Sequence, residues 1–497
     1  MTAQQGEQNK QDKQDKQEIA QELAAFVAEA AKAYDVPGVS VGVLFEETEL
    51  CTAHGVATAA NPVPIDERTL FHIASATKSV TATALTRLAA EGKVDFDATV
   101  RTYVPELKLA DEAHAARLTV RNLLDHTGGL EWNLIDTGSS ANSAHADSTH
   151  ADTAQAGSAH DDGTLAAFVA KLEALPLIGA PGARASYSQA GYNLLGRVIE
   201  KVTGQPYEQA VAELVLTPLG LTDTVFDLDD VMTRKFAVGH NRDAQGTLHT
   251  ATPWKSYPAG THGNNPGGGA ASCARDLLRW ARFHLGQETA ADNEVLSVQD
   301  RRSMQEPKSE LRGSTLGDAF GFGWFLKEIG GVRTFGHGGS GNGQFAELLM
   351  VPEHGFAVVV LSNCAPEGYQ LNQDIVKWAL EHFIGVAEQD PEPVAYDPRR
   401  NRDVVGRYAI DAMNLDVLDD GERLALAVGI KPEIRAASET DMPQDYPAAA
   451  MGFLAEDGDD YIITEGGLKG QRGYFTRDES GAVIGIDIAG RLFGRAG

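Results

Sequence analysis

Helix-type and strand-type patterns alternate along this chain in an order that restricts its fold more than any single motif. Residues 18–34 carry apolar side chains at helical spacing, and residues 39–45 and 49–56 read as two strands. A mostly helical stretch follows at about 165–216, and then an amphipathic helix at 273–285. Strand-like runs come next, at 331–336, 344–351 and 356–362. This order predicts one α/β sheet domain interrupted by a helical domain.

The last hundred residues follow a different pattern. Residues 388–398 are acidic and contain prolines, which is typical of a linker. Turn signals such as Asp420-Gly421 and Ser480-Gly481 separate short strand-like runs beyond it. These runs include 407–410, 423–428, 461–464, 473–477, 482–488 and 491–495. We therefore expect a main domain at 18–387 and a small antiparallel β-barrel or sandwich at 399–497.

The composition excludes several classes of partner. The chain has 70 acidic and 42 basic residues and a formal net charge of −28, which argues against binding to nucleic acid or to an anionic membrane. Residues 1–17 are nearly all polar and include no apolar core of a signal peptide, so they predict a disordered leader and a cytoplasmic chain. The sequence leaves homo-oligomerisation open.

Two features bear on metal binding. Residues 138–163 form a low-complexity insert that contains three His-x-Asp tripeptides, and we interpret it as a solvated loop rather than a metal site. A metal-dependent hydrolase that uses this loop is the alternative. Cys51, Cys273 and Cys364 are odd in number and have no Cys-x-x-Cys spacing, so they predict neither a disulfide framework nor a zinc site. We expect no metal and no other cofactor.

Two serine motifs compete for the role of nucleophile. Gly38-Val39-Ser40-Val41-Gly42 matches G-x-S-x-G, but that motif needs a strand before the serine and a helix after it, and here the order is reversed. Ser75-Ala76-Thr77-Lys78 is the one S-x-x-K of the chain, and it stands where a helix is expected to begin. One helical turn places Lys78 beside Ser75, where a lysine of lowered pKa can take the hydroxyl proton.

Two further segments support Ser75. Tyr187 directly precedes a predicted helix, and nearby ammonium charge would lower the pKa of its phenol enough for a general base. His337-Gly338-Gly339-Ser340 lies between predicted strands, where glycine lets backbone N–H groups approach a substrate closely. His337 can add positive charge or a hydrogen bond.

With these motifs in this order, the chain resembles the serine β-lactamase and penicillin-binding-protein superfamily, and within it the class-C-like branch of esterases and D-aminopeptidases. Segments 119–130, 218–224 and 267–272 are also similar to that branch, and the resemblance covers roughly residues 36–383. It implies an α+β fold with an antiparallel sheet, flanking helices and an all-helical insert. The C-terminal region resembles the lipocalin-like β-barrel that some of these hydrolases carry.

The resemblance also implies a role for each motif residue. Ser75 would be the acylated nucleophile, and Lys78 and Tyr187 would share proton transfer. The N–H groups of Ser75 and Ser340 would form the oxyanion hole, whose loss costs about 10²–10³ in rate per donor.

Two substrate-binding positions depart from the most familiar pattern. His337-Gly338-Gly339 stands where β-lactamases have the triplet K-T-G, so His337 replaces the lysine and Gly339 is the glycine. Many esterases and D-peptidases of the branch also have a histidine there. Gln189 stands where the family usually has the asparagine of Y-x-N, which keeps the amide but adds one methylene.

These roles predict a serine hydrolase that cleaves an ester or an amide, such as a small ester or a D-amino-acid peptide, through an acyl-enzyme on Ser75. A β-lactamase or a D-Ala-D-Ala carboxypeptidase is one alternative, although His337 removes a fixed charge that would hold the β-lactam carboxylate. A catalytically silent protein that reuses the cleft for binding is the other, and Gln189 is the feature that favours it.

Overall fold

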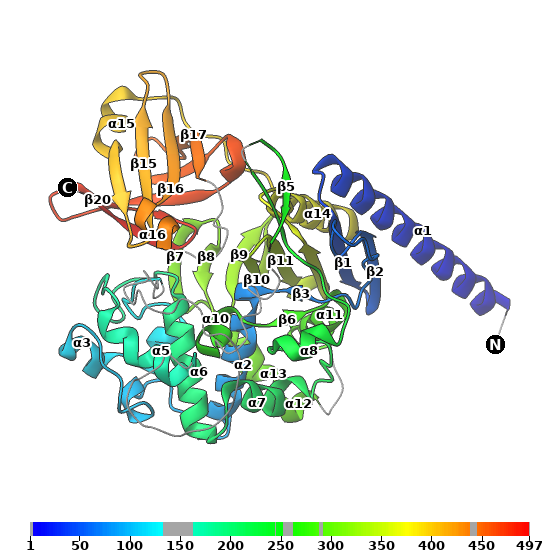
Figure 1. The fold of residues 1–497 in the computed structure, drawn as a ribbon. Helices are drawn as coiled ribbons and strands as arrows, with labels where there is room; N and C mark the ends of the chain where they lie inside the picture. Colours follow the sequence, from blue (N-terminus) through cyan, green and yellow to red (C-terminus); the bar gives the residue numbers. More distant parts are fainter. Residues whose placement is uncertain are drawn as a thin grey trace.

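The structure is a computed structural model that describes residues 3–132, 163–243, 245–251, 262–287, 292–437 and 445–496 (Figure 1). The three His-x-Asp tripeptides of the predicted insert lie outside the described residues. Across the described ranges, none of the helices has the length and apolar character needed to span a membrane.

An eight-stranded sheet forms the centre of the main domain, with the strand order β2-β1-β12-β11-β10-β9-β8-β7. Its neighbouring strands pair antiparallel, which confirms the expected sheet. The strands are β1 (Gly38–Phe45), β2 (Thr48–Gly55), β7 (Ser309–Ser314), β8 (Gly317–Phe320), β9 (Phe325–Ile329), β10 (Val332–Gly341), β11 (Gln344–Val351) and β12 (Phe356–Ser362). β7 to β9 were not among the predicted strands.

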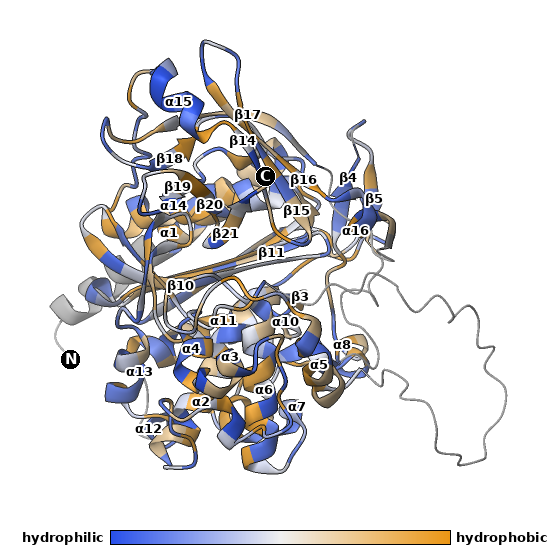
Figure 2. Ribbon diagram, turned by 90° about the vertical axis from the view of Figure 1, so that its left-hand side faces the viewer, coloured by the Kyte–Doolittle hydropathy of each residue, from blue (hydrophilic) through white to orange (hydrophobic). Residues whose placement is uncertain are grey.

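Both faces of this sheet are covered, which explains the nearly continuous apolar runs of β1 and β12. Val358 and Val360 of β12 pack in one core with helices α1 and α14, whereas Val359 and Leu361 pack in another with α11 and α2. Successive side chains of a strand point to opposite faces, so a strand between two cores has no polar side. Figure 2 views the sheet nearly edge-on, between the layer of α2, α6 and α11 and the layer of α1 and α14.

The predicted helical domain lies on one side of the sheet. It begins with α2 directly after Ser75 and includes α6, whose start places Tyr187. The helices on this side include α2 (Thr77–Ala90), α3 (Glu112–Arg117), α4 (Val120–Leu124), α5 (Leu165–Lys171), α6 (Gln189–Thr203), α7 (Tyr207–Val211), α8 (Leu228–Met232), α10 (Asn265–Gly268), α11 (Ala274–Leu285), α12 (Asp292–Val295) and α13 (Val298–Met304). Short strand pairs accompany them: β3 (Phe71–His72) with β6 (Ala271–Ser272), and β4 (His240–Arg242) with β5 (Leu248–Thr250) and β13 (Cys364–Ala365).

The N-terminal helix is longer than predicted. The spacing of apolar residues indicates a helix from residue 18, whereas α1 covers Ala3–Ala33. The backbone of the predicted leader is therefore helical over most of its length in this structure. Leu23 and Val27 of α1 are buried against α14 (Glu367–Ile384) and β1. Glutamine, lysine and glutamate are good helix formers, so a helix anchored by this apolar face can continue through a polar stretch.

The C-terminal region is a closed eight-stranded barrel, which confirms the expected β-barrel. Leu415, Tyr461 and Phe475 are among the buried side chains that fill it. Its strands are β14 (Gly406–Ala409), β15 (Met413–Asp419), β16 (Leu424–Ile430), β17 (Tyr446–Phe453), β18 (Asp460–Ile463), β19 (Arg472–Arg477), β20 (Val483–Ile488) and β21 (Arg491–Arg495), with helices α15 (Pro398–Val404) and α16 (Pro432–Ala437) beside them. The barrel sits at the β7 end of the sheet (Figure 1).

Candidate active site

Ser75 lies in a single 3₁₀ turn, Ala74–Ala76, immediately before α2. Ala74 has φ +44°, a left-handed conformation that costs energy for a residue with a side chain. Thr77 stabilises the turn, because its hydroxyl donates to the Ala74 carbonyl at 2.6 Å and accepts from the Ala270 N–H at 3.1 Å. Ser75 remains partly exposed among buried neighbours and lines a cavity of about 720 Å³.

Lys78 is fully buried one turn further on and points its amine at the serine. Its Nζ lies 3.3 Å from the Ser75 Oγ and donates to the Gly267 carbonyl at 2.6 Å and to Gln189 Oε1. No carboxylate within ion-pairing distance neutralises it among the described residues. Burial, and secondly the charge of Arg491, hold the pKa of Lys78 well below its usual value of 10.5. A neutral amine beside Ser75 can accept the hydroxyl proton.

Gln189, the departure from the family's asparagine, has a defined place. Its carbonyl oxygen accepts from Lys78, and its Nε2 donates to Asn264 Oδ1 at 3.0 Å. Gly267 makes room for the longer side chain, because a Cβ there would lie 2.2 Å from Gln189 Nε2. The extra methylene is therefore accommodated, and the amide contacts Lys78.

Tyr187 is held by three different parts of the chain. The next residue, Ser188, caps α6 with its side chain and donates its N–H to His126 Nδ1 at 3.1 Å. The Tyr187 N–H donates to Gly490 of the barrel at 2.8 Å, and its ring packs 4.6 Å from the His126 ring. The Lys78 Nζ lies 4.8 Å from the centre of the Tyr187 ring. Tyr187 is thus brought beside Ser75 and Lys78.

The expected lowering of the Tyr187 pKa is wrong. Burial raises the pKa of the phenol above its usual value near 10, and the nearby Ser75 side chain and Arg491 charge oppose that rise only in part. The hydroxyl makes no hydrogen bond of normal geometry with the described residues. Tyr187 is therefore suited to pass a proton on, not to act as a stored phenolate.

His337 is neutral, so its expected positive charge is also not found. Burial, and secondly the charge of Lys78, lower the pKa of His337 to about 3. Its Nδ1 lies 2.7 Å from the Gly338 carbonyl, its ring stacks on Phe325 at 4.0 Å, and its Nε2 has no partner in the described part of the chain. A neutral ring whose Nδ1 donates to Gly338 leaves Nε2 as an acceptor.

Gly339 and Ser340 lie at the free edge of β10. Pairing of β10 with β9 ends at Gly336, so the strand borders the cavity at Gly338, Gly339 and Ser340. A Cβ on Gly339 would lie 2.0 Å from the Ile73 carbonyl oxygen and 3.2 Å from the Ser75 nitrogen. Glycine is therefore required for β10 to approach the nucleophile this closely.

We expect Gly339→Ala to lower kcat by about 10²–10³-fold, the cost typical of a lost oxyanion donor, because the added methyl pushes β10 away from Ser75. Gly494→Ala is the matched control, since a Cβ there meets nothing within 4 Å. Steady-state rates and melting curves of both variants separate the site from the fold. An active Gly339→Ala enzyme would show that this contact is not needed.

The barrel contributes a residue that the sequence did not reveal. Arg491 begins β21 and lines the same cavity as Ser75. Its guanidinium lies 4.8 Å from the Trp132 ring centre and 5.5 Å from that of Tyr187, and its buried Nε has no hydrogen-bond partner in the described ranges. An arginine remains charged even when burial lowers its pKa, so Arg491 places a fixed cation beside Tyr187.

Ser40, the competing serine, is a structural residue. It is buried within β1, between β2 and β12, and its hydroxyl donates to the Asp66 carbonyl at 3.3 Å. The prediction that it is part of a strand is confirmed.

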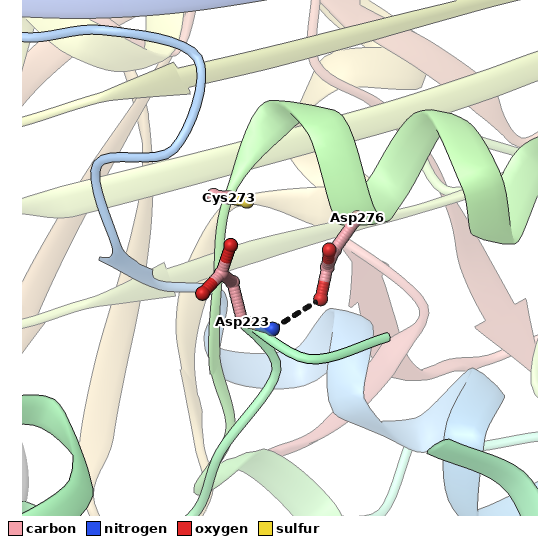
Figure 3. Close-up of side chains that lie close together, drawn as sticks. All are labelled: Asp223, Cys273 and Asp276. Carbon is pink, nitrogen blue, oxygen red and sulfur yellow. Dashed lines mark hydrogen bonds between the residues drawn. The ribbon is translucent and has the colours of Figure 1, made fainter. Parts of the chain in front are cut away.

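One group of described side chains has the spacing of metal ligands: Asp223, Cys273 and Asp276, whose ligand atoms lie within 4.8 Å of one another (Figure 3). Asp276 accepts from the Asp223 N–H at 2.8 Å and from the Thr224 hydroxyl at 3.0 Å, and Asp223 pairs with Arg68 at 2.6 Å. Burial, together with these carboxylates, raises the pKa of the Cys273 thiol to about 12. Both carboxylates already have these partners, so the cluster forms an internal hydrogen-bond network.

Comparison with known proteins identifies the family. The family model described as Beta-lactamase matches residues 23–380, and the chain belongs to this family. Penicillin-binding protein 4 of Amycolatopsis lactamdurans is 28% identical over 334 residues, which cover 66% of this chain and 81% of that protein.

Two solved structures share the fold. The crystal structure of SurE superimposes with a TM-score of 0.70 at 24% identity and covers 96% of this chain and 99% of that one. D-amino acid amidase from Ochrobactrum anthropi SV3, complexed with L-phenylalanine amide, gives 0.57 at 24% identity, with 73% and 99% covered. At these identities the likeness concerns the fold. Together, the family and the site support a serine hydrolase in general terms.

Proposed function

We propose that this chain hydrolyses an ester or an amide through an acyl-enzyme on Ser75. The observation that carries the proposal is the pair formed by Ser75 and Lys78: a partly exposed hydroxyl on a large cavity, with a buried amine of lowered pKa 3.3 Å away. This pair has the two parts that nucleophilic catalysis by serine requires, a nucleophile and a base within reach.

The geometry suggests how the steps would follow. Neutral Lys78 takes the proton as the Ser75 Oγ attacks the carbonyl carbon, and the N–H groups of Ser75 and Ser340 stabilise the oxyanion. The proton then passes through the Tyr187 hydroxyl to the leaving oxygen or nitrogen, which departs and leaves the acyl group on Ser75. Water attacks the acyl carbon as the same base accepts its proton. The bond between the acyl carbon and the Ser75 Oγ then breaks, the base returns the proton to Oγ, and the acid is released.

The charges around the cavity bear on the substrate. His337 is neutral and cannot hold an anionic group as a lysine would, whereas Arg491 is charged and forms no ion pair within 4 Å in the described part of the chain. We therefore favour amide or ester substrates with a carboxylate near the scissile bond, such as a peptide with a free carboxyl end. This preference is compatible with D-amino-acid peptides and keeps a carboxypeptidase or a β-lactamase as alternatives.

We expect Arg491→Gln to lower kcat/KM about 10–100-fold on a substrate with a free carboxylate, the size of a lost charge-assisted hydrogen bond, and only slightly on its amidated analogue. The measurement compares D-aminoacyl peptides with free and amidated ends. Arg423→Gln is the control, because Arg423 is exposed on the same barrel and pairs with Asp420 and Glu465. Equal losses on both substrates would contradict a role in carboxylate binding.

A panel of p-nitrophenyl esters, D-aminoacyl p-nitroanilides and nitrocefin tests the reaction class directly. Turnover of the esters or anilides is the expected result, and nitrocefin tests the β-lactamase alternative. A chain that binds these compounds but never turns them over would instead be the silent binding protein that Gln189 favoured. The contact between Gln189 and Lys78 supports an assembled site.

The remaining proposals concern organisation. We propose that residues 18–387 and 399–497 are separate domains joined by 388–398. We also propose that the protein works in the cytoplasm, on a small-molecule or peptide substrate, and that self-association is open to test by light scattering.

A further inference from the structure

The cavity at Ser75 continues past the active site onto the other face of β10. Gly339 faces the helical layer, as its close approach to Ser75 shows, so its neighbours Gly338 and Ser340 face the side of α14. All three residues line the same cavity of about 720 Å³. We call its extension on the α14 side the outer groove, defined by Gly338, Ser340, Glu347, Gln373 and Lys377. Its size suits a ligand larger than a small ester.

Glu347 forms the floor of the outer groove beside Gly338. The two residues are paired across β10 and β11, and a Cβ on Gly338 would lie 3.0 Å from Glu347 Oε2. Gly338 has no side chain to cover the carboxylate, so the carboxylate is open to the groove. Gln373 of α14 donates to Glu347 Oε2 at 3.2 Å. An amide donor adds no positive charge, and Lys327, whose charge acts on this carboxylate, is already paired with Glu388.

Three other charged groups of the groove, Lys327, Lys377 and Asp374, already have partners. Lys327 forms an ion pair with Glu388, and Lys377 lies 3.6 Å from Asp390. Asp374 accepts from Tyr34 and from Gln370. Lys469 of the barrel also lines the groove, on its exposed side. Across the described ranges, no cation lies within 4 Å of the Glu347 carboxylate, whose pKa burial raises to about 7.

Glu347 and Ser75 each lie against one of two consecutive residues of β10, which sets an upper limit on the distance between them. Gly338 adjoins Glu347 and Gly339 adjoins Ser75, so the Glu347 carboxylate lies within about 13 Å of the Ser75 nitrogen. An extended peptide covers that distance in about three to four residues. A single substrate can therefore contact both groups.

We propose that the outer groove binds the acyl portion of the substrate and that Glu347 pairs with a primary ammonium group on it, such as a peptide amino terminus or a lysine-like side chain. This inference rests on the proposed acyl transfer to Ser75 and adds its substrate class. The ammonium supplies the cation that Glu347 lacks, and Gln373 completes the carboxylate's hydrogen bonding. Arg491 of the barrel lies beside Tyr187 and remains available to pair with a carboxylate of the substrate.

The test compares p-nitrophenyl esters of 8-aminooctanoic and octanoic acid, whose acyl chains differ only by the terminal ammonium. For each protein we take the kcat/KM of the amino ester divided by the kcat/KM of the neutral ester. We expect this ratio to be about 10–100-fold lower in Glu347→Gln than in the wild type. The change should come from a higher KM for the amino ester, and the neutral ester should be unaffected. Asp374→Asn is the matched control, since it removes a carboxylate from the same groove that already has partners. Its ratio should stay near that of the wild type.

A binding measurement keeps the inference separate from catalysis. Calorimetry on Ser75→Ala with 8-aminooctanamide and octanamide should show the same preference for the amine, and Ser75→Ala/Glu347→Gln should lose it. The proposal would be overturned if neither the wild type nor Ser75→Ala prefers the amine, or if the preference persists in Glu347→Gln. It would also be overturned if Asp374→Asn loses the amine preference as fully as Glu347→Gln. If neither ester is hydrolysed but the binding preference is found, the proposed hydrolysis fails and the groove assignment stands.

Discussion

Ser75→Ala is expected to lower kcat by on the order of 10⁵-fold or more, because removal of a serine nucleophile leaves only binding and oxyanion stabilisation to accelerate the reaction. The substitution removes one oxygen from a partly exposed position, so the fold should be unaffected. Lys78 keeps its bonds to Gln189 and the Gly267 carbonyl without the serine. Steady-state rates on the best ester or anilide of the panel provide the measurement.

Ser40→Ala is the matched control for this loss. Ser40 belongs to the competing G-x-S-x-G motif, but its hydroxyl is buried in β1 and bonded to the Asp66 carbonyl. We expect normal kcat and a small loss of stability, typical of one neutral hydrogen bond. An inactive but folded Ser40→Ala variant, or an active Ser75→Ala variant, would move the nucleophile away from the S-x-x-K motif.

The second large effect concerns Lys78. Its replacement by methionine removes the base and should lower kcat about 10³–10⁴-fold. Lys78→Arg should be nearly as inactive, although it retains a cation, because arginine does not release its proton in the working pH range. A Lys78→Arg enzyme with near-normal activity would show that position 78 needs only charge.

The pH profile of kcat/KM gives an independent test of Lys78. The pKa of Lys78 is lowered, so the amine is protonated and inactive at low pH and becomes an active base as the pH rises through a value well below 10.5. Activity should therefore rise with pH to a plateau. Burial also raises the pKa of Glu347 and Asp487 to about 7, so their ionisation could produce a similar rise. The profile is therefore repeated with Glu347→Gln and Asp487→Asn. The rise should persist in both variants.

Local patterns predicted much of the fold. The apolar runs at 39–45 and 356–362 became strands because strands between two cores are apolar on both faces, and 344–351 formed a strand that also carries Gln344 and Glu347. β7 to β9 were missed, since each strand is only 4 to 6 residues long and Gly313, Gly317, Gly321 and Gly323 interrupt the segment. α1 was predicted too short because the apolar spacing that identifies its packed part ends where the polar residues begin.

The candidate site was predictable only where motif and local structure coincide. Ser75 and Lys78 are one turn apart, and Tyr187 precedes a capped helix, so short-range patterns located them. Arg491 and Glu347 could not be found this way. They lie in an alternating strand of another domain and in a central strand, and only tertiary packing brings them to the cavity. The pKa direction of Tyr187 was misjudged because burial outweighs nearby charge, and His337 keeps only the hydrogen-bonding half of its expected role because burial and the Lys78 charge both lower its pKa.

The most direct test of the acyl-enzyme is to trap it. The protein is mixed with a slowly deacylating ester or a fluorophosphonate, quenched in acid, digested and mapped by mass spectrometry. We expect one covalent adduct per chain, on the peptide that contains Ser75, and its absence from Ser75→Ala. A wild-type protein that turns over substrate with no adduct, or with the adduct on a different residue, would contradict the account.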